Sequence, residues 1–301
     1  MKMTLMGTGT SHGVPVIACD CAVCRSTDPR DTRLRCSAYI TEPARIVIDT
    51  GPEFRLQAIR YGIRGLDAVL LTHSHADHLH GLDDLRIFSH TRSSDASPSN
   101  PRSLETEGKG IAIYTNPTCL RDVRYRFDYV FKEVQLGGGK PKLDMEDNSR
   151  FRPGNPLVIG GLEILPVPLL HGSLEDSGYL LSETNSRDGR KHSIAYLTDL
   201  SFIPEESVSL IQENAGILDH LVVDAIRIKR HSTHYNFTDA LALAERLVPR
   251  HTWFVHLTHD LSHLQVEAFT AAILPEYPAL LKAVREGGSV GPAWDGLVLE
   301  S

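Results

Sequence analysis

Apolar runs alternate along the chain with segments of helical spacing. Ala68–Thr72 is an almost continuous apolar run, which is typical of a strand covered on both faces. Cys36–Thr41 and Arg45–Asp49 are rich in β-forming residues and are separated by Glu42-Pro43, so they predict a hairpin. Further strands are predicted at Met3–Met6, Ile111–Thr115, Leu162–Leu170, Gly178–Ser182, Ser193–Thr198, Leu221–Asp224 and Thr252–His256. Helices are predicted at Pro52–Tyr61, Pro117–Arg126, Pro204–Ala215, Thr238–Val248 and Gln265–Leu274.

The order of these elements indicates the fold class. Strands come in adjacent runs and helices are interleaved later, which favours an α/β fold with two sheets sandwiched between helices over one doubly wound sheet. We expect one domain over residues 1–301, since 301 residues suit one large domain or two small ones. Thr91–Gly110 and Gly137–Pro156 predict flexible loops, which are either lids over an active site or insertions without function.

Composition narrows the possible functions. The chain is 41% apolar and 23% charged, as in ordinary globular proteins. Its net charge of −7 disfavours a protein that binds long nucleic acid through bulk charge, whereas a small anion held by a metal or histidine cluster stays open. We find no signal-like N-terminal segment and no apolar run of about 18 residues. The expectation is a cytoplasmic protein with no membrane partner.

Histidines and cysteines give the first indication of metal chemistry. The 15 histidines gather at 73–80, 231–234 and 251–263 rather than spreading evenly. Three of the five cysteines lie in Cys19-Asp-Cys21-Ala-Val-Cys24, and their odd total and tight spacing argue against a disulfide framework. Cys36 and Cys119 stand alone in apolar stretches and are interpreted as small core residues.

Four ligand-type residues follow the apolar run at 68–72. In His73-Ser-His75-Ala-Asp77-His78, the two first histidines point to the same side of an extended chain because side chains alternate. A helix that starts near Asp77 would offer Asp77 and His78 to a neighbouring point. Imidazole and carboxylate ligands in this arrangement suit two adjacent cations of zinc, manganese or iron. The alternative, a solvated histidine-rich turn, is disfavoured by four ligand types directly after a buried strand.

This segment resembles the H-x-H-x-D-H signature of the metallo-β-lactamase superfamily, and the resemblance extends along nearly the whole chain. It implies a four-layer αββα sandwich and a dinuclear metal site completed by three later residues at strand ends, which match His171, Asp199 and His256. By this resemblance, one metal is held by His73, His75 and His171, the other by Asp77, His78 and His256, and Asp199 bridges the two.

A narrower resemblance comes from the cysteines. Phosphodiesterases of the phosphoribosyl cyclic-phosphodiesterase type, related to the tRNA 3′-endonuclease branch, carry C-x-C-x-x-C near the N-terminus and a histidine three residues after the last active-site histidine. The resemblance implies a structural zinc held by Cys19, Cys21, Cys24 and His259. Four such ligands form a closed tetrahedral site that fastens a loop and does not react. His263 stays open as an alternative ligand.

Three more residues have roles that the resemblance implies. His234 is similar to a histidine that these phosphodiesterases place before a helix, where it protonates the leaving alkoxide or binds a phosphoryl oxygen. The competing interpretation is a capping or surface histidine, and His231 is a weaker version of the same idea. Asp49 matches an Asp-x-Gly turn near the site, where it would orient a ligand histidine.

The function expected from this set is hydrolysis of a small phosphodiester, such as a cyclic ribose phosphate or a nucleotide-like ester. Hydroxide held by two divalent cations, zinc or manganese, would attack phosphorus, with Asp77 orienting it and His234 assisting the departing oxygen. The alternatives are a tRNA 3′-processing endoribonuclease, which the negative net charge disfavours, and a non-catalytic metal-binding accessory protein. A homodimer is expected as the commonest arrangement of soluble enzymes.

Overall fold

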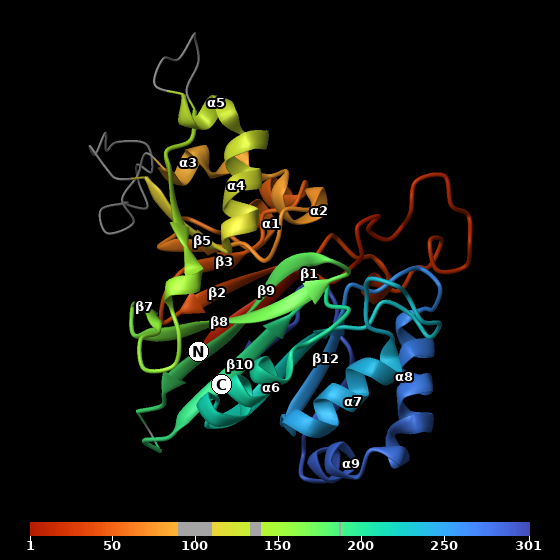
Figure 1. The fold of residues 1–301 in the computed structure, drawn as a ribbon. Coiled ribbons are helices and arrows are strands. Elements are labelled where there is room, and N and C mark those ends of the chain that lie inside the picture. The colour runs from red at the N-terminus through yellow and green to blue at the C-terminus, as the bar shows by residue number, and fades with distance from the viewer. Residues whose placement is uncertain (90–109, 133–139, 187) are drawn as a thin grey trace.

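A computed structural model describes residues 1–89, 110–132, 140–186 and 188–301. Two sheets of seven strands each lie face to face among these residues, as Figure 1 shows. The first sheet has the order β14 (Val298–Glu300), β1 (Lys2–Gly7), β2 (Ser37–Glu42), β3 (Ile46–Ile48), β4 (Ala68–Leu70), β5 (Ile111–Thr115) and β6 (Leu143–Asp147). The second has the order β13 (Ser289–Pro292), β12 (His251–Val255), β11 (Ile217–Asp224), β10 (Lys191–Leu197), β9 (Leu174–Thr184), β8 (Leu162–His171) and β7 (Leu157–Ile159).

Apolar side chains on both faces of the strands explain why each sheet is covered twice. In β3, Ile46 and Ile48 pack into the core between the sheets, while Val47 packs into a second core under helices. In β10, Ile194 and Tyr196 join the central core, and Ala195 joins a third core on the far side. Successive side chains of a strand point to opposite faces, so continuous apolar strands require a partner layer on each side.

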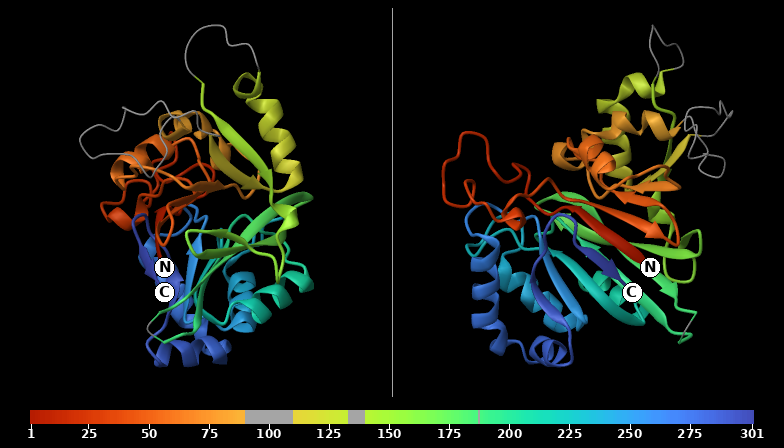
Figure 2. Two further views of the ribbon diagram at one scale, coloured as in Figure 1. Left: turned by 90° about the vertical axis from the view of Figure 1, so that its left-hand side faces the viewer. Right: turned by 180° about the vertical axis from the view of Figure 1, so that it is seen from behind.

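Helices provide the two outer layers, which Figure 2 shows from two further sides. Phe54 of the first helix and Val123 of the fourth pack on the first sheet, and Val208 and Phe237 of later helices pack on the second. The helices are α1 (Phe54–Arg60), α2 (Ala76–Leu79), α3 (Arg86–Ser89), α4 (Pro117–Arg126), α5 (Asp128–Phe131), α6 (Glu205–Asn214), α7 (Phe237–Leu247), α8 (His263–Ile273) and α9 (Pro278–Arg285). Among the described residues, every helix is too short or too polar to cross a bilayer.

The four-layer αββα sandwich expected from the sequence is confirmed. Helix α4 has the predicted bounds, and strands β9 and β11 extend beyond theirs. The predicted loop at 137–156 is wrong for Leu143–Asp147, which forms β6. This edge strand buries only Met145 among acidic neighbours, so its sequence carries little apolar signal. The predicted loop at 91–110 lies outside the described residues except for Gly110.

Parallel pairing sets where the polar strand ends meet. β3, β4, β5 and β6 are parallel neighbours in the first sheet, and β10, β11, β12 and β13 are parallel neighbours in the second. The carboxyl ends of parallel strands lie at one edge of a sheet. The segments that follow β4, β10, β11 and β12 therefore emerge together, and they carry the histidines and aspartates that the sequence analysis selected.

Candidate functional site

Three residues that follow strands have an unusual backbone conformation. Asp49 follows β3, Asp199 follows β10 and His256 follows β12, and all three have left-handed backbone conformations, with φ of 61°, 53° and 61°. This conformation is uncommon outside glycine, although Asp, Asn and His adopt it more often than other residues. Strained backbone of this kind concentrates at functional sites, because it aims side chains where a regular strand could not.

A first ligand group comes from the ends of β4 and β8. One ring nitrogen each of His73, His75 and His171 lies within 4.8 Å of the others. His171 Nδ1 donates a hydrogen bond to the carbonyl oxygen of Thr233 at 2.7 Å, which leaves Nε2 with its lone pair. The loop that contains Thr233 packs so closely here that a side chain on Gly172 would meet Thr233 Cγ2 at 3.1 Å.

A second ligand group adjoins the first and consists of Asp77, His78, Asp199 and His256. Asp199 lies at its centre, with one carboxylate oxygen 3.1 Å from His78 Nε2 and the other 3.1 Å from His256 Nε2. Asp77 Oδ2 lies 3.3 Å from His78 Nε2 and 3.7 Å from His256 Nε2. Asp77 lies in the first turn of α2 beside the Asp-Thr-Gly turn, where a side chain on Gly51 would lie 2.2 Å from the Asp77 carbonyl oxygen.

Opposite charges set the protonation of this second group. Burial opposes ionisation of Asp199, but His256 and His78 hold its pKa well below the usual range. Burial likewise opposes charge on His78, yet Asp199, Asp77 and Asp49 raise the pKa of that imidazole. In the first group, burial lowers the pKa of His171 to about 4 and that of His73 well below its usual value. Neutral imidazoles and ionised carboxylates are the forms that bind metal, so a cation in the second group would take the place of the proton that the carboxylates favour on His78.

Unsatisfied buried atoms test whether these residues fit a pair of cations. His73 Nε2, His78 Nε2 and His256 Nε2 are buried and make no hydrogen bond with any described residue. Buried polar atoms without a partner are rare in native structures, and an absent ion is one of the accepted reasons for them. Imidazole nitrogen and carboxylate oxygen are ligands that zinc, manganese and iron accept. The residues present therefore fit two divalent cations, one for each group.

Residues behind the ligands hold them in orientation. His78 Nδ1 donates to Asp49 Oδ2 at 2.7 Å, and Asp49 also accepts from the backbone and the hydroxyl of Thr72. Asp49 thus lies where the sequence analysis expected it. Asp176, which the sequence analysis missed, is buried with Oδ1 at 3.6 Å from His73 Nδ1. Carboxylates that engage the outer nitrogen of a ligand histidine fix its tautomer and ring direction.

His234 lies against both ligand groups. Its ring centroid is 4.5 Å from that of His171 and 4.6 Å from that of His256. His234 Nδ1 contacts Asp224 Oδ2 at 2.7 Å, and burial lowers the pKa of His234 to about 4 while raising that of Asp224 well above its usual value. The exposed His231 ring lies 5.1 Å from that of His234.

Asp224 was missed by the sequence analysis, although a signal for it existed. It ends the apolar run Leu221-Val-Val-Asp224 as the last residue of β11, while His256 and Asp199 follow the neighbouring strands β12 and β10 by one and two residues. A carboxylate at the carboxyl end of a buried parallel strand, between two other strands that end in candidate ligands, could have been selected on that ground alone.

A separate group of four potential metal ligands joins the N-terminal loop to the segment after β12. Cys19, Cys21 and Cys24 place their sulfurs 3.4, 3.5 and 3.3 Å from Nδ1 of His259. Tetrahedral zinc with bonds of about 2.3 Å to sulfur and 2.0 Å to nitrogen requires sulfur and nitrogen to lie about 3.5 Å apart, so the spacing fits. The Cys24 N–H donates to Cys21 Sγ and lowers the pKa of that thiol to about 6. His263 lies elsewhere, with Arg33 Nη2 3.2 Å from its Nδ1.

Replacing Cys21 with Ser is expected to remove one zinc per chain and to lower the melting temperature by roughly 5–10 °C, since the bound metal stabilises only the folded chain. Activity below the melting temperature should persist, because this group does not touch the other two. Calorimetry, elemental analysis and an activity assay check these outcomes. Asp20→Ser is the matched control, since Asp20 is exposed between two of the cysteines. Unchanged zinc content in the Cys21 variant would contradict a structural zinc.

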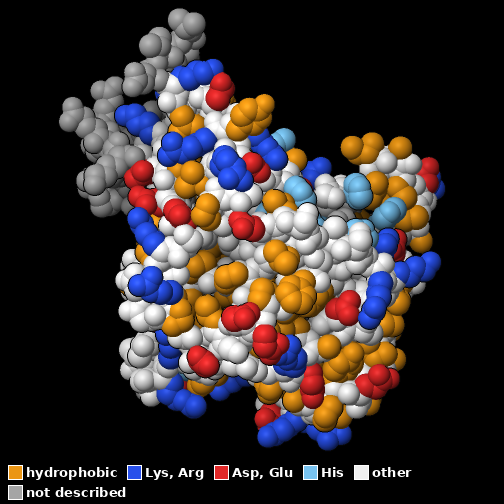
Figure 3. All heavy atoms as spheres, viewed as in Figure 1, with side chains coloured by type: hydrophobic (Ala, Val, Ile, Leu, Met, Phe, Trp, Pro, Cys, Tyr) orange, Lys and Arg blue, Asp and Glu red, His pale blue; other side chains and the backbone are white. Residues whose placement is uncertain are grey.

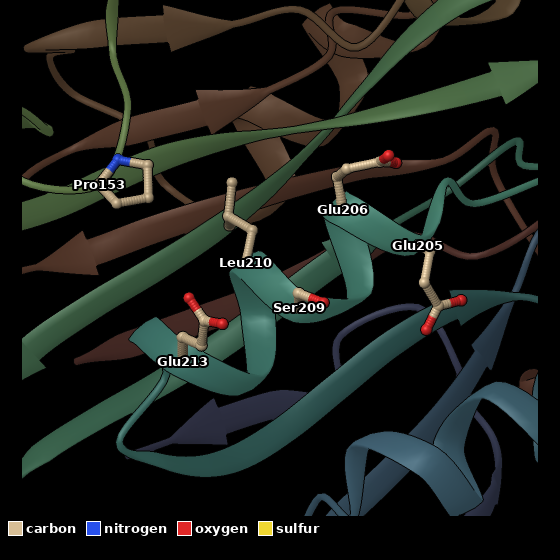
Figure 4. Close-up of a pocket in the computed structure, with 6 residues that line it drawn as sticks. All are labelled: Pro153, Glu205, Glu206, Ser209, Leu210 and Glu213. Carbon is tan, nitrogen blue, oxygen red and sulfur yellow. The ribbon is translucent and has the colours of Figure 1, made fainter.

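The histidine site is distinct from a pocket on α6. Figure 3 shows histidine side chains gathered on one part of the surface, with Lys and Arg side chains nearby. Figure 4 shows a pocket on α6 that is lined by Pro153, Glu205, Glu206, Ser209, Leu210 and Glu213. Its carboxylates would repel a phosphate, and it contains no member of the ligand groups. The histidine cluster is therefore the candidate functional site.

Comparisons with known proteins agree with this geometry. The model of the β-lactamase superfamily domain matches residues 44–257. A crystal structure of a diphosphatase from the PhnP family is 36% identical, with a TM-score of 0.75 over 100% of this chain and 97% of that one. Zinc-bound PqqB from Methylobacterium extorquens, at 18% identity, TM-score 0.68 and 100% coverage of both chains, shares the fold. So does the short form of human tRNase Z, at 19% identity and TM-score 0.60, covering 100% of this chain and 99% of that one.

A curated relative extends the comparison to a longer protein. An octanoyltransferase from Porphyromonas gingivalis is 32% identical over 280 residues, which are 92% of this chain and 49% of that protein. The chain thus spans about half the length of the curated relative that it matches. The superfamily model covers most of this chain, and the whole chain superposes on metallo-β-lactamase folds. The chain belongs to the β-lactamase superfamily, and its fold is that of the superfamily's metal-dependent hydrolases.

Proposed function

We propose that this protein is a dinuclear metal-dependent hydrolase that cleaves a small phosphodiester, such as a cyclic ribose phosphate or a nucleotide-like ester. The observation that carries the proposal is the meeting of the two ligand groups at Asp199, with the His234–Asp224 pair beside them. The similarity to a diphosphatase at 36% identity supports a substrate with phosphorus as the reacting centre. Octanoyl transfer is not carried over, because half of the protein so named lies outside the match.

The proposed mechanism divides the work between metals and protein. A pair of divalent cations in such a site supplies a water of lowered pKa and neutralises the phosphate oxygens. His73, His75 and His171 would hold one cation, Asp77, His78 and His256 the other, and Asp199 would touch both. Asp49 and the Thr72 hydroxyl, which lies 3.0 Å from His73 Nδ1, keep the ligand rings in place from behind, and Asp176 packs next to His73. Asp77 is the carboxylate with some exposure to the site, so it can also orient the attacking water.

His234 and Asp224 would deliver a proton to the departing oxygen. Burial raises the pKa of Asp224 and lowers that of His234. The two side chains therefore share one proton, which can lie on either of them. A phosphodiester monoanion that binds next to His234 favours the imidazolium form of the pair. The proton then lies on the ring that faces the substrate, where it can neutralise a leaving alkoxide.

A substrate panel tests the proposal. With added zinc or manganese, the protein is expected to hydrolyse bis(p-nitrophenyl) phosphate and a ribose cyclic phosphate, and His78→Ala is expected to lose turnover by about a thousandfold or more. Elemental analysis should find about three metals per chain in the wild type. The matched control is His80→Ala, because His80 is exposed two residues further along and belongs to no ligand group.

The same panel separates the alternatives. Trimming of a precursor tRNA without cleavage of either small ester would replace the proposal with a tRNA 3′-processing endoribonuclease. Metal binding without turnover of any of these substrates would indicate an accessory protein. Equal activity of the wild type and His78→Ala would contradict every version of a hydrolase that uses this metal site.

A further inference from the structure

One helix of the outer layer contacts the segment that carries two histidines of the first ligand group. This ligand segment, Leu71–His75, follows β4 and has no regular secondary structure. Helix α4 packs beside it, since Val123 of the helix and Leu71 of the segment belong to one apolar core. Backbone groups of such a segment are not paired within a helix or a sheet, so side chains must supply the partners that hold it in one conformation.

Ser74 stands between His73 and His75 and is bound through both its side chain and its backbone. It is buried, and its hydroxyl donates a hydrogen bond to Asp122 Oδ2 at 2.6 Å. Its carbonyl oxygen accepts a hydrogen bond from Arg126 Nη1. Asp122 and Arg126 lie one turn apart on α4 and form an ion pair, with Arg126 Nη2 3.9 Å from Asp122 Oδ2. Two side chains of one helix therefore hold the residue that joins the two ligand histidines.

The start of α4 is tied to the same ligand segment. Asn116 caps the helix, because its Oδ1 accepts a hydrogen bond from the Cys119 N–H at 2.8 Å. Its Nδ2 donates to the carbonyl oxygen of Thr72, the residue before His73, at 3.2 Å. The helix thus contacts the ligand segment at its N-cap and again in its last turn. The segment cannot shift along the helix without breaking hydrogen bonds at both places.

His75 needs such support more than the other two members of its group. It is exposed, whereas His73 and His171 are buried, so packing restrains its ring least. The outer nitrogen of His171 binds the Thr233 carbonyl, but the His75 ring forms no hydrogen bond with any described residue. Metal–ligand distances tolerate deviations of only about 0.2 Å. The direction of His75 is therefore set mainly by the backbone on which it stands.

The charges on α4 are arranged so that they do not oppose a cation. Burial lowers the pKa of the His75 ring, and the nearby charge of Arg126 lowers it further. An unpaired guanidinium at this place would also repel a metal ion in the first ligand group. Asp122 balances that charge through the ion pair. The pair can therefore supply hydrogen bonds to Ser74 with little repulsion of a bound cation.

The second ligand group is held by other residues. In the described parts of the chain, α4 forms no hydrogen bond or ion pair with any member of that group. His78, for example, is oriented by Asp49 from the end of β3. A change on α4 should therefore disturb the first ligand group much more than the second.

We propose that Asp122 and Arg126 are positioning residues, which hold Ser74 so that His75 keeps the direction in which it binds the first cation. The proposal rests on the metal site of the proposed function and adds a determinant of metal affinity to it. Neither residue touches a cation or a substrate in this role. Both act through Ser74, and their effect is confined to one of the two cations.

Titration with cobalt(II), after zinc has been loaded into the cysteine group, tests the proposal. The wild type is expected to bind two cobalt ions at the histidine site, and His75→Ala identifies the binding step that belongs to the first ligand group. Asp122→Ala and Arg126→Ala should each raise that dissociation constant about tenfold, the low end of the range for residues that support metal ligands. The other dissociation constant should change less than about threefold. Visible absorption of cobalt follows both steps.

Further variants separate positioning from a general loss of stability. Arg126→Lys keeps a donor and the charge, so its binding should stay within about threefold of the wild type. The double variant Asp122→Ala/Arg126→Ala should lose less than the product of the two single losses, because both changes act through Ser74. Arg121→Ala is the matched control, since Arg121 is an exposed cation on the same helix directly before Asp122. It should bind both cobalt ions as the wild type does.

The outcomes distinguish the two levels of the argument. A wild type that binds no cobalt at the histidine site would defeat the proposed function itself. Two bound ions in the wild type, with unchanged constants in both alanine variants or equal weakening of both steps, would overturn the positioning role alone. Arg126 is exposed, so Arg126→Ala keeps the test decisive even if Asp122→Ala does not fold.

Discussion

Asp199→Asn is expected to lower kcat/KM for a small phosphodiester by on the order of a thousandfold or more, and to reduce the metal content of the histidine site. The substitution keeps the size of the side chain and removes its charge. It acts on both ligand groups together, because the two oxygens of Asp199 lie 3.1 Å from His78 Nε2 and from His256 Nε2. Mutation of residues that hydrogen-bond to metal ligands typically lowers metal affinity or activity 10–100-fold. Loss of a ligand shared by two cations should lower activity by more than that.

Two measurements separate loss of metal from loss of fold. Elemental analysis should show fewer metals at the histidine site, while the zinc of the cysteine group is retained. Circular dichroism should show an unchanged fold, because Asp199 is one residue in a sandwich with three separate apolar cores. Asp128→Asn, an exposed aspartate paired with Lys132, serves as the control and should keep full activity. Wild-type turnover by Asp199→Asn would mean that chemistry does not occur at this site.

The fold was predictable because the buried strands can be recognised in the sequence as short, continuous apolar runs. Ala68–Leu70 and Ile194–Leu197 are apolar on both faces, and only two covered sheets can bury such strands. Edge strands were not predictable by the same reasoning. β6 and β14 are partly exposed and follow no strong apolar pattern, so they form because a neighbouring strand offers unpaired backbone groups. Such pairing depends on tertiary context and leaves little trace in local sequence.

The candidate ligands were predictable for a related reason. His73, His171, Asp199 and His256 each stand at or directly after the end of an apolar strand, so the sequence shows both the residue type and the place where the chain leaves the sheet. The structure brings all seven expected ligands into two adjacent groups, and their binding of metal stays a prediction. The residues that contact the ligand histidines from the protein side were harder to predict from the sequence. Asp176 lies inside β9, where a buried carboxylate is explained only by the histidine packed against it.

Pairing between distant residues was the hardest feature to derive. His259 could be distinguished from His263 as the fourth residue of the cysteine group only by resemblance, since both follow β12 by a few residues. In the structure, the turn after β12 directs His259 to the cysteines, while α8 starts at His263 and buries it beside Arg33. A difference of four residues decides the ligand, and sequence spacing alone does not resolve it.

His234→Asn is expected to reduce kcat by about 100-fold on a substrate with an alkoxide leaving group, while metal content is unchanged. The reason is that proton delivery to the leaving oxygen contributes about 10²–10⁴-fold, and a sugar alkoxide is a poor leaving group without it. A nitrophenolate departs readily without a proton, so the loss on bis(p-nitrophenyl) phosphate should be much smaller. The ratio of the two losses measures the role in proton transfer separately from a role in binding.

Asp224→Asn provides the second half of this argument, because Asp224 acts through His234. Its Oδ2 lies 2.7 Å from His234 Nδ1, and the amide would keep the contact but could not stabilise an imidazolium. We expect a loss of about tenfold on the alkoxide substrate, and little further loss when His234→Asn is also present, since both changes remove the same proton. Additive losses in the double variant would show that the two residues act separately. Equal losses of His234→Asn on the alkoxide and nitrophenolate substrates would assign His234 to phosphate binding in place of proton transfer.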